Sequence, residues 1–259
     1  MMKILAIDTS TMLGGIAITD DSLGLIAEVR LNVKSTHSER LMTEIDHILR
    51  QAGLTLSDMD VFAVAIGPGS FTGLRIGLST VKGLSYATEK PIVSVPTLEA
   101  LAWNFPYCKY PVCTMLDARK KEVYAALFQW DNNGFIRLID EVAINVLEFL
   151  KRFDENNPPE SPHTPLLKRG AGGDFEGGLG GLSHERVIFT GEGVPLYRDK
   201  IIESIGGKAI FASYEKMIPS PANVASLGIK KAQEGKFSEP ISLVPFYIRR
   251  SEAEIKGDA

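Results

Sequence analysis

An apolar run that leads directly into a glycine-rich turn constrains the fold of this chain more than any other feature. Residues 61–66 are all apolar, and they are followed by Gly67-Pro68-Gly69-Ser70 and then by Phe71-Thr72-Gly73-Leu74-Arg75. The run predicts a strand buried on both faces, and the turn predicts the start of a helix over about 72–86. The turn's glycines allow a close approach of backbone, and the first amides of the helix can face an anion or a partner. Since such turns are frequent in α/β proteins, this element alone identifies no function.

Two similar units divide the chain. Residues 3–8 and 12–19 are apolar strands around a polar turn that begins at Asp8, and the same pattern surrounds Asp117 within residues 112–128. Both patterns predict a β-hairpin, and aligning Asp8 with Asp117 superposes strand, aspartate, turn and strand. Residues 186–197 add a further strand, a turn with Gly191 and Gly193, and a helix start. The chain therefore consists of two related halves.

Paired hairpins of this kind resemble the actin, Hsp70 and sugar-kinase superfold (ASKHA). The resemblance implies an α/β fold of two domains with duplicated mixed-sheet halves, in which the hairpins hold the phosphates of a nucleotide. The corresponding phosphate-binding candidates are Asp8, Ser10, Thr11, Asp117, Arg119, Gly191 and Gly193. A shared fold does not establish a shared function, so the function must be inferred from the residues of the turns.

The two candidate phosphate turns differ from those of active kinases, which need glycines so that backbone amides reach phosphate oxygens. The first turn has hydroxyl residues followed by Gly14 and Gly15, whereas the second, residues 118–122, has no glycine. Asp8 and Asp117 could hold magnesium through water, or each could cap its own turn. We expect these sites to be weak and vestigial, with no independent nucleotide turnover.

Four segments in order carry a more specific resemblance. They are Ile7-Asp8-Thr9-Ser10, Thr36-His37-Ser38-Glu39-Arg40-Leu41, the block that begins at Gly67, and Pro245-Phe246-Tyr247-Ile248-Arg249-Arg250-Ser251-Glu252-Ala253-Glu254. With them the chain resembles the bacterial TsaB (YeaZ) family over nearly its whole length. The resemblance implies a role in making threonylcarbamoyladenosine (t6A), the modified base beside the anticodon of certain tRNAs.

The same resemblance implies partners rather than catalysis. In that family the protein is a non-catalytic partner of the transferase TsaD, and the ATPase TsaE completes the assembly. It further implies a cytoplasmic protein that forms a homodimer when alone and requires no cofactor; whether a nucleotide binds at a partner interface stays open. No catalytic residue is predicted.

Two other functions were weighed against this one. The first is a small-molecule kinase or ATPase of the superfold, which the glycine-free second turn disfavours. The other is a metallopeptidase-like protein, which would need two histidines at positions i and i+4 to hold a metal ion. Here His37 is followed four residues later by Leu41, so no metal site is predicted.

Composition favours indirect contact with tRNA. The formal net charge is −4 and the sequence contains no long cluster of lysine and arginine, whereas a protein that grips tRNA by itself is expected to present a basic face. Two cysteines are too few for a disulfide framework and fit a reducing compartment. The first apolar run is interrupted by Asp8, so neither a signal peptide nor a membrane span is expected.

We predict an N-terminal domain over residues 1–106 and a C-terminal domain over 107–259. The second domain contains a glycine- and proline-rich surface insertion at about 154–186. The superfold implies that a helix at about 222–233 crosses back towards the first domain.

A contact surface is predicted on the two N-terminal helices. Gly73 and Gly77 are four residues apart, and glycines on one face allow another helix to come close. The alternative is close packing of these glycines against the protein's own sheet. The resemblance to the TsaB family implies association through the two N-terminal helices, either with a second copy or with TsaD. The partner or dimer surface that it implies comprises His37, Arg40, Leu41, Glu44, Gly73, Leu74, Gly77 and Thr80.

Overall fold

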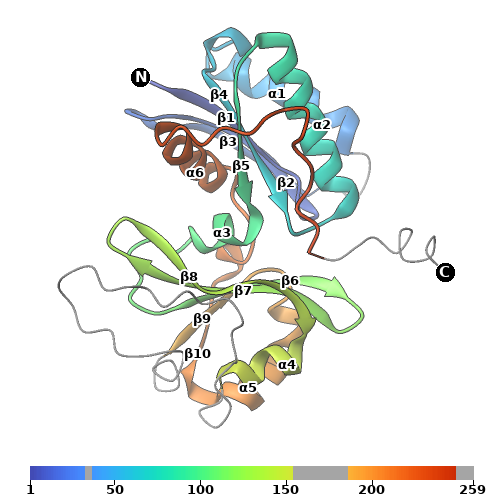
Figure 1. The fold of residues 1–259 in the computed structure, drawn as a ribbon, viewed down its shortest axis with the longest axis vertical. Coiled ribbons are helices and arrows are strands. Elements are labelled where there is room, and N and C mark those ends of the chain that lie inside the picture. The colour runs from blue at the N-terminus through green and yellow to red at the C-terminus, as the bar shows by residue number, and fades with distance from the viewer. Residues whose placement is uncertain (33–36, 154–185, 249–259) are drawn as a thin grey trace. The chain divides into compact units, whose positions relative to one another are not determined.

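The computed structural model describes residues 1–32, 37–153 and 186–248 (Figure 1). The chain divides into two compact units, one formed by residues 1–106 and 213–259 and the other by residues 107–212. A boundary after residue 106 agrees with the sequence prediction, but the assignment of 213–259 to the second domain is wrong. The insertion predicted at about 154–186 lies, except for its last residue, outside the described residues.

The first unit contains a five-stranded sheet in the order β3-β2-β1-β4-β5. Its strands are β1 (Lys3–Asp8), β2 (Leu13–Asp20), β3 (Gly24–Asn32), β4 (Val61–Gly67) and β5 (Ile92–Pro96). Strands β1, β2 and β3 form antiparallel pairs, while β4 pairs in parallel with β1 and β5 in parallel with β4. The predicted first hairpin and the buried strand before the glycine-rich turn are therefore confirmed.

Helices cover both faces of this sheet (Figure 1). They are α1 (His37–Gln51), α2 (Phe71–Thr88), α3 (Thr97–Ala102) and α6 (Pro221–Gln233). The alternation of β-strand side chains separates two cores: Leu5 and Phe62 belong to the cluster with α1 and α2, whereas Ile4 and Ala63 belong to the cluster that includes residues of α6. Each central strand is therefore buried on both faces, which explains why its sequence is apolar without interruption.

Helix α6 packs on the sheet of the first unit, which is why the predicted domain boundary fails for residues 213–259. A side chain at Gly228 would come within 2.7 Å of Ile4 and 2.8 Å of Ala63, so the helix backbone lies close to the strands. At its N-terminus, Glu28 of β3 accepts hydrogen bonds from the hydroxyl of Ser220 (2.7 Å) and from the amide of Ala222 (3.2 Å). The return of α6 is confirmed, and with it the segment after residue 212 belongs to the first unit.

The second unit repeats the topology. Its sheet has the order β10-β9-β6-β7-β8, formed by β6 (Val112–Arg119), β7 (Glu122–Asp131), β8 (Gly134–Asn145), β9 (Val187–Thr190) and β10 (Ala209–Phe211). Strands β6, β7 and β8 are antiparallel neighbours, and β9 and β10 follow in parallel, as β4 and β5 do in the first unit. The prediction of an α/β fold with duplicated mixed-sheet halves is confirmed.

Two short helices, α4 (Val146–Leu150) and α5 (Arg198–Ile205), complete the second unit. Aromatic rings fill its core: Phe149 contacts Phe153, and Phe189 lies between Phe153 and Phe211. Single turns of 3-10 helix occur at Leu56–Asp58, Lys151–Phe153, Pro195–Tyr197, Gly206–Lys208 and Tyr214–Lys216. Within the described ranges, no helix has the length and apolar character that a membrane crossing requires.

Candidate functional site

The turn between β1 and β2 is the first candidate phosphate site, and its hydroxyls are hydrogen-bonded within the chain. Thr9 donates to the carbonyl of Gly73 (2.7 Å), Ser10 to the Asp8 carboxylate (2.6 Å) and Thr11 to the carbonyl of Leu13 (3.1 Å). All three side chains are buried. Donors that a phosphate would need are therefore already satisfied by the protein itself.

The glycine-rich turn and the start of α2 close over this first turn. The peptide bond between Gly67 and Pro68 is cis. The amide of Ser70 donates a 2.6 Å hydrogen bond to the carbonyl of Ser10. A side chain at Gly69 would clash with that carbonyl, and one at Gly73 would clash with the carbonyl of Thr9. The glycines serve close backbone contact inside the protein, which is the use that their conformational freedom permits.

Asp8 lies at the centre of this packed turn and is 1% exposed. Its Oδ1 accepts from both the amide (2.9 Å) and the hydroxyl of Ser10, while its Oδ2 has no hydrogen-bond partner among the described residues. Burial raises the pKa of Asp8, and the two hydrogen bonds from Ser10 oppose that rise. A buried carboxylate with one unsatisfied oxygen destabilises the fold, so its environment favours the protonated form.

The second candidate turn, between β6 and β7, is open and charged. The amide of Arg119 donates to Asp117 Oδ1 (3.0 Å), and its guanidinium lies 3.6 Å from Oδ2 of the same carboxylate. Arg119, Lys120 and Lys121 have positive φ angles of 65°, 53° and 65°. The aspartate therefore caps its own turn, which was one of the two alternatives for it, and the turn adopts a backbone that glycine would favour.

Gly191 and Gly193 follow β9 and lie beside β6. A side chain at Gly191 would clash with the carbonyl of Met115, and the amide of Gly193 donates to the same carbonyl (3.1 Å). The residue between them, Glu192, has a raised pKa because of burial and of the negative charge of Asp117. The charge of Arg119 opposes that rise. The close contacts of Gly191 and Gly193 with Met115 show that the two glycines allow this loop to pack closely against β6.

The candidates thus fall into two groups, one in each unit. Asp8, Ser10 and Thr11 lie together in the first unit, and Asp117, Arg119, Gly191 and Gly193 lie together in the second. Among the described residues, no group of three or more His, Cys, Asp or Glu side chains could hold a metal ion.

Four of the residues predicted for a contact surface are buried in the first unit, so that part of the prediction is wrong. Leu41 and Leu74 belong to the protein's own core. Gly73 and Gly77 face Thr9, the residue after β1, and a side chain on Gly77 would clash with the hydroxyl of Thr9. For the two glycines, the alternative of close packing within the protein itself is therefore the correct one.

The remaining predicted contact residues lie on α1 and α2 and are not part of the described core. Arg40 is exposed, and Glu44 and Thr80 are half-buried. His37 begins α1, and its side chain lies outside the described part of the structure.

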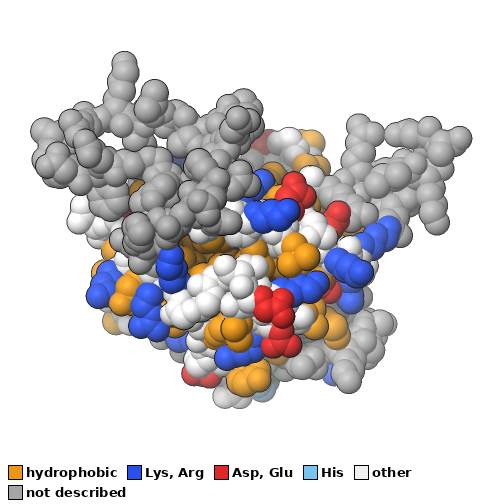
Figure 2. Space-filling view, turned by 90° about the horizontal axis from the view of Figure 1, so that it is seen from below, with side chains coloured by type: hydrophobic (Ala, Val, Ile, Leu, Met, Phe, Trp, Pro, Cys, Tyr) orange, Lys and Arg blue, Asp and Glu red, His pale blue; other side chains and the backbone are white. Residues whose placement is uncertain are grey.

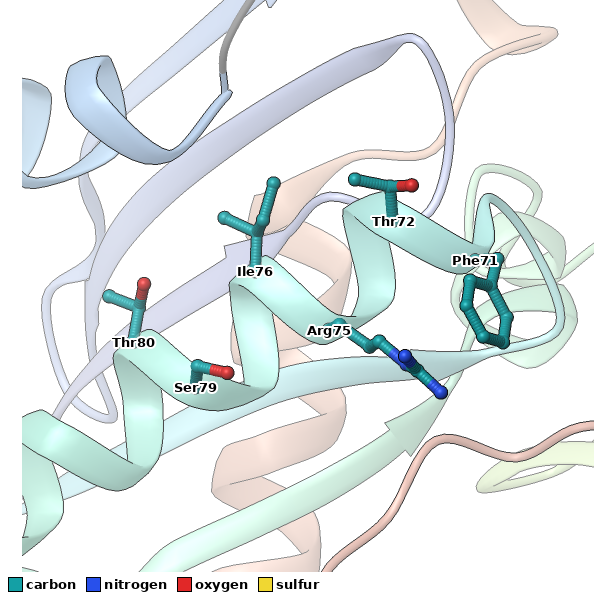
Figure 3. A pocket seen from close by; sticks show the side chains of 6 residues that line it. All are labelled: Phe71, Thr72, Arg75, Ile76, Ser79 and Thr80. Carbon is teal, nitrogen blue, oxygen red and sulfur yellow. The ribbon is translucent and has the colours of Figure 1, made fainter.

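The outer face of α2 shares only Thr80 with the predicted contact surface. It forms an open groove of about 460 Å³ lined by Phe71, Thr72, Arg75, Ile76, Ser79 and Thr80 (Figure 3). In Figure 3 these side chains project from successive turns of the helix, with Arg75 extended towards Phe71. One turn further, Gly83 has no atom within 4 Å of the position of a side chain, and Tyr86 is 91% exposed. The first unit therefore presents a helix face with small, aromatic and cationic residues.

Comparison with known proteins identifies the family. A protein of Bacillus subtilis named tRNA threonylcarbamoyladenosine biosynthesis protein TsaB is 29% identical over 98% of this chain and 97% of its own length. The protein of that name from Escherichia coli is 38% identical over 51% of this chain and 58% of its own length. The family model described as TsaD, tRNA N6-adenosine threonylcarbamoyltransferase, matches residues 25–257. The chain belongs to the TsaD family, in its TsaB (YeaZ) group.

The known TsaB-like folds agree with this structure. A crystal structure from Pseudomonas aeruginosa, described as an uncharacterized protein with similarity to peptidase YeaZ, superposes with a TM-score of 0.72 at 23% identity, covering 96% of this chain and 100% of the other. At that identity the likeness shows the fold alone. The relatives named TsaB and the family model, rather than this structure, confirm the family that the sequence motifs predicted.

Sequence reasoning missed the residues that form the outer surface of this TsaB-group protein at α2. In the sequence, Phe71 and Arg75 belong to the glycine-rich block and Tyr247 belongs to a late motif, and neither position marks a surface. The spacing of the polar residues Thr72, Arg75, Ser79 and Thr80 along α2 could have located the exposed side. Nothing local signals that Tyr247 joins them.

Proposed function

We propose that this chain is a non-catalytic partner of a TsaD-type threonylcarbamoyl transferase in the synthesis of threonylcarbamoyladenosine in tRNA. In this proposal it acts in the cytoplasm, assembles with TsaD and the ATPase TsaE, and forms a homodimer when alone. It requires no cofactor of its own. The names of its relatives in the TsaB group support the pathway, and the family model supports descent from the same ancestor as the transferase.

The observation that carries the non-catalytic role is the closed first turn. Thr9, Ser10 and Thr11 use their hydroxyls for hydrogen bonds within the chain, and the Gly67–Ser70 turn covers them. A kinase or ATPase needs amides and hydroxyls that are free to bind transferred phosphate. A turn in which those donors are already used supports a structural role.

Indirect contact with tRNA is the second part of the proposal. The chain carries a net charge of −4. On the face seen in Figure 2, the described lysine and arginine side chains are interspersed with acidic and hydrophobic ones. Strong phosphate-backbone binding needs several cations that act together, so this composition supports recruitment of tRNA through the partner.

Reconstitution tests the proposed function. TsaD and TsaE from the same organism, threonylcarbamoyl-adenylate and an unmodified tRNA are mixed with and without this chain, and modified nucleoside is measured by mass spectrometry. We expect modification only when the chain is present. Full modification by TsaD and TsaE alone would contradict the proposal.

A matched pair of variants tests whether the groove on α2 is the surface that binds the partner. Ser79→Trp places a bulky ring in the groove on α2, and Leu23→Trp places the same ring on an exposed residue between β2 and β3. We expect Ser79→Trp to lower the rate of modification at least about tenfold, since an interface loses affinity when its centre is blocked. Leu23→Trp should retain the wild-type rate of modification. Equal losses of rate in both variants would exclude the groove as the surface that binds the partner.

A further inference from the structure

Phe71, Arg75 and Tyr247 form one cluster that joins helix α2 to a segment far away in the sequence. The guanidinium carbon of Arg75 lies 3.8 Å from the centroid of the Phe71 ring, and its Nε donates a 3.0 Å hydrogen bond to the Tyr247 hydroxyl. The rings of Phe71 and Tyr247 are stacked, with centroids 5.1 Å apart. The guanidinium is therefore fixed both by a ring and by a hydrogen bond, which lowers the entropy lost when it binds a further group.

The backbone next to Tyr247 is fixed as well. The amide of Phe246 donates a 2.8 Å hydrogen bond to the carbonyl of Ile66, and a side chain at Gly67 would come within 2.8 Å of the Phe246 carbonyl. Leu243 is buried in the core beneath α1 and α2. The segment before Tyr247 is thus part of the fold of the first unit, and it positions the tyrosine against α2.

The charge of Arg75 has no counterpart among the described residues, where its recorded partners are Phe71 and Tyr247. No described carboxylate lies within 4.0 Å of it. Arg75 is exposed and is the fifth residue of an 18-residue helix, where the helix dipole offers a cation no stabilisation. The terminal nitrogens of a fixed guanidinium remain available to a group from outside the chain.

We propose that Arg75 anchors a carboxylate side chain of the TsaD-type partner, and that Tyr247 is the residue that positions Arg75. This inference rests on the proposed function and names the chemistry of its contact. A guanidinium fork matches a carboxylate in a bidentate geometry, and stacking on Phe71 leaves the terminal N–H groups free to donate to the carboxylate. The groove beside it continues along α2 with Thr72, Ile76 and Ser79, which is the surface that the proposed function assigns to the partner.

The test measures the affinity of this chain for purified TsaD by titration calorimetry at about 0.05 M and about 0.5 M salt. We expect Arg75→Gln to weaken binding at least about tenfold at low salt and to remove most of the salt dependence. Tyr247→Phe keeps the ring and loses the hydroxyl, so a loss of about threefold with the salt dependence retained is expected. Lys82→Gln removes the same charge elsewhere on α2 and should bind like the wild type.

The outcomes separate this inference from the proposed function. Equal affinity of wild type and Arg75→Gln for TsaD, or equal losses of affinity in Arg75→Gln and Lys82→Gln, would contradict the role of Arg75. Binding of this chain to TsaD would still be supported. Absence of binding by the wild type itself would overturn both. If Arg75→Gln lowers self-association in sedimentation experiments and leaves TsaD binding unchanged, the carboxylate belongs to a second copy of this chain and the proposal is wrong.

Discussion

The hydroxyl of Thr9 donates a 2.7 Å hydrogen bond to the carbonyl of Gly73, 64 residues away in the sequence. The two residues belong to the first hairpin turn and to helix α2, and the absence of a side chain at Gly73 allows the two backbones to meet. One contact thus explains both why the hairpin turn is closed and why the predicted glycine face of α2 points inward.

Two glycines of the same helix should respond in opposite directions to alanine. Gly77→Ala places a methyl group against the hydroxyl of Thr9, and we expect a loss of about 1–3 kcal/mol in the free energy of unfolding. Gly83→Ala adds a methyl group where no atom lies within 4 Å, and it should stabilise the isolated chain by about 0.5–1 kcal/mol through helix propensity. Urea unfolding followed by circular dichroism measures both; effects of the same sign would contradict the orientation of α2.

Asp8→Asn should stabilise the protein at neutral pH. Because burial raises the pKa of Asp8 above its ordinary value of 3.8, the folded state holds the proton more tightly than the unfolded chain. The stabilisation from this carboxyl group is complete below pH 3.8 and is lost as the pH rises through the folded-state pKa. The variant cannot ionise, so its melting temperature at pH 7 should exceed that of the wild type by roughly 2–4 °C, with a smaller difference near pH 4.

Asp20→Asn is the matched control for Asp8→Asn, because both aspartates accept hydrogen bonds from the amide and hydroxyl of the serine two residues later. At Asp20 the bonds from Ser22 lower the pKa to about 2. This carboxylate stabilises the fold above pH 3.8, and its contribution is lost as the pH falls towards 2. Asp20→Asn should therefore lower the melting temperature at pH 7. A higher melting temperature in both variants would contradict the different environments described for the two carboxyl groups.

Lys121→Gly should stabilise the second hairpin. Lys121 has a φ of 65°, a conformation that costs a residue with a side chain about 1 kcal/mol and costs glycine little. We expect a gain of about 1 kcal/mol in thermal or denaturant unfolding. Lys121→Ala removes the same charge and keeps the strain, so it should leave the stability close to that of the wild type.

The purified chain should show no metal-dependent hydrolysis of ATP and no peptidase activity. ATP hydrolysis is not expected because the hydroxyls of Thr9, Ser10 and Thr11 are bound to the chain itself. Peptidase activity is not expected because Leu41 stands where a second metal-binding histidine would be needed, four residues after His37. Phosphate release with magnesium present measures the first activity. ATP hydrolysis that is lost in Asp8→Asn would instead identify the chain as a kinase or ATPase.

The sequence predicted those parts of the fold whose signals are local. The apolar run before Gly67 and the repeated aspartate pattern at Asp8 and Asp117 predicted β4, α2 and the two hairpins, because alternation, turn residues and spacing are encoded over a few neighbouring residues. The duplicated mixed-sheet topology was implied by the resemblance of the paired hairpins to the ASKHA superfold.

The exposed side of α2 could not be predicted in the same way. Glycines suggested a contact with another helix, but it is Thr9 of the first hairpin that approaches them, with its carbonyl at Gly73 and its hydroxyl at Gly77. Likewise, Tyr247 reaches Phe71 only because the chain returns after residue 212 to the first unit. Contacts between residues so far apart are set by tertiary packing and leave no periodic signal in either segment.

The return of α6 to the first sheet also determines when each unit can be completed during synthesis. Residues 107–212 contain all the strands of the second sheet, so that unit can form as soon as it has emerged from the ribosome. The sheet that begins at Lys3 has one face covered only in part, by α3, until Pro221–Gln233 has emerged, although its strands are made first. Protease digestion of ribosome-bound chains of increasing length should therefore show protection of the middle of the sequence before protection of its beginning.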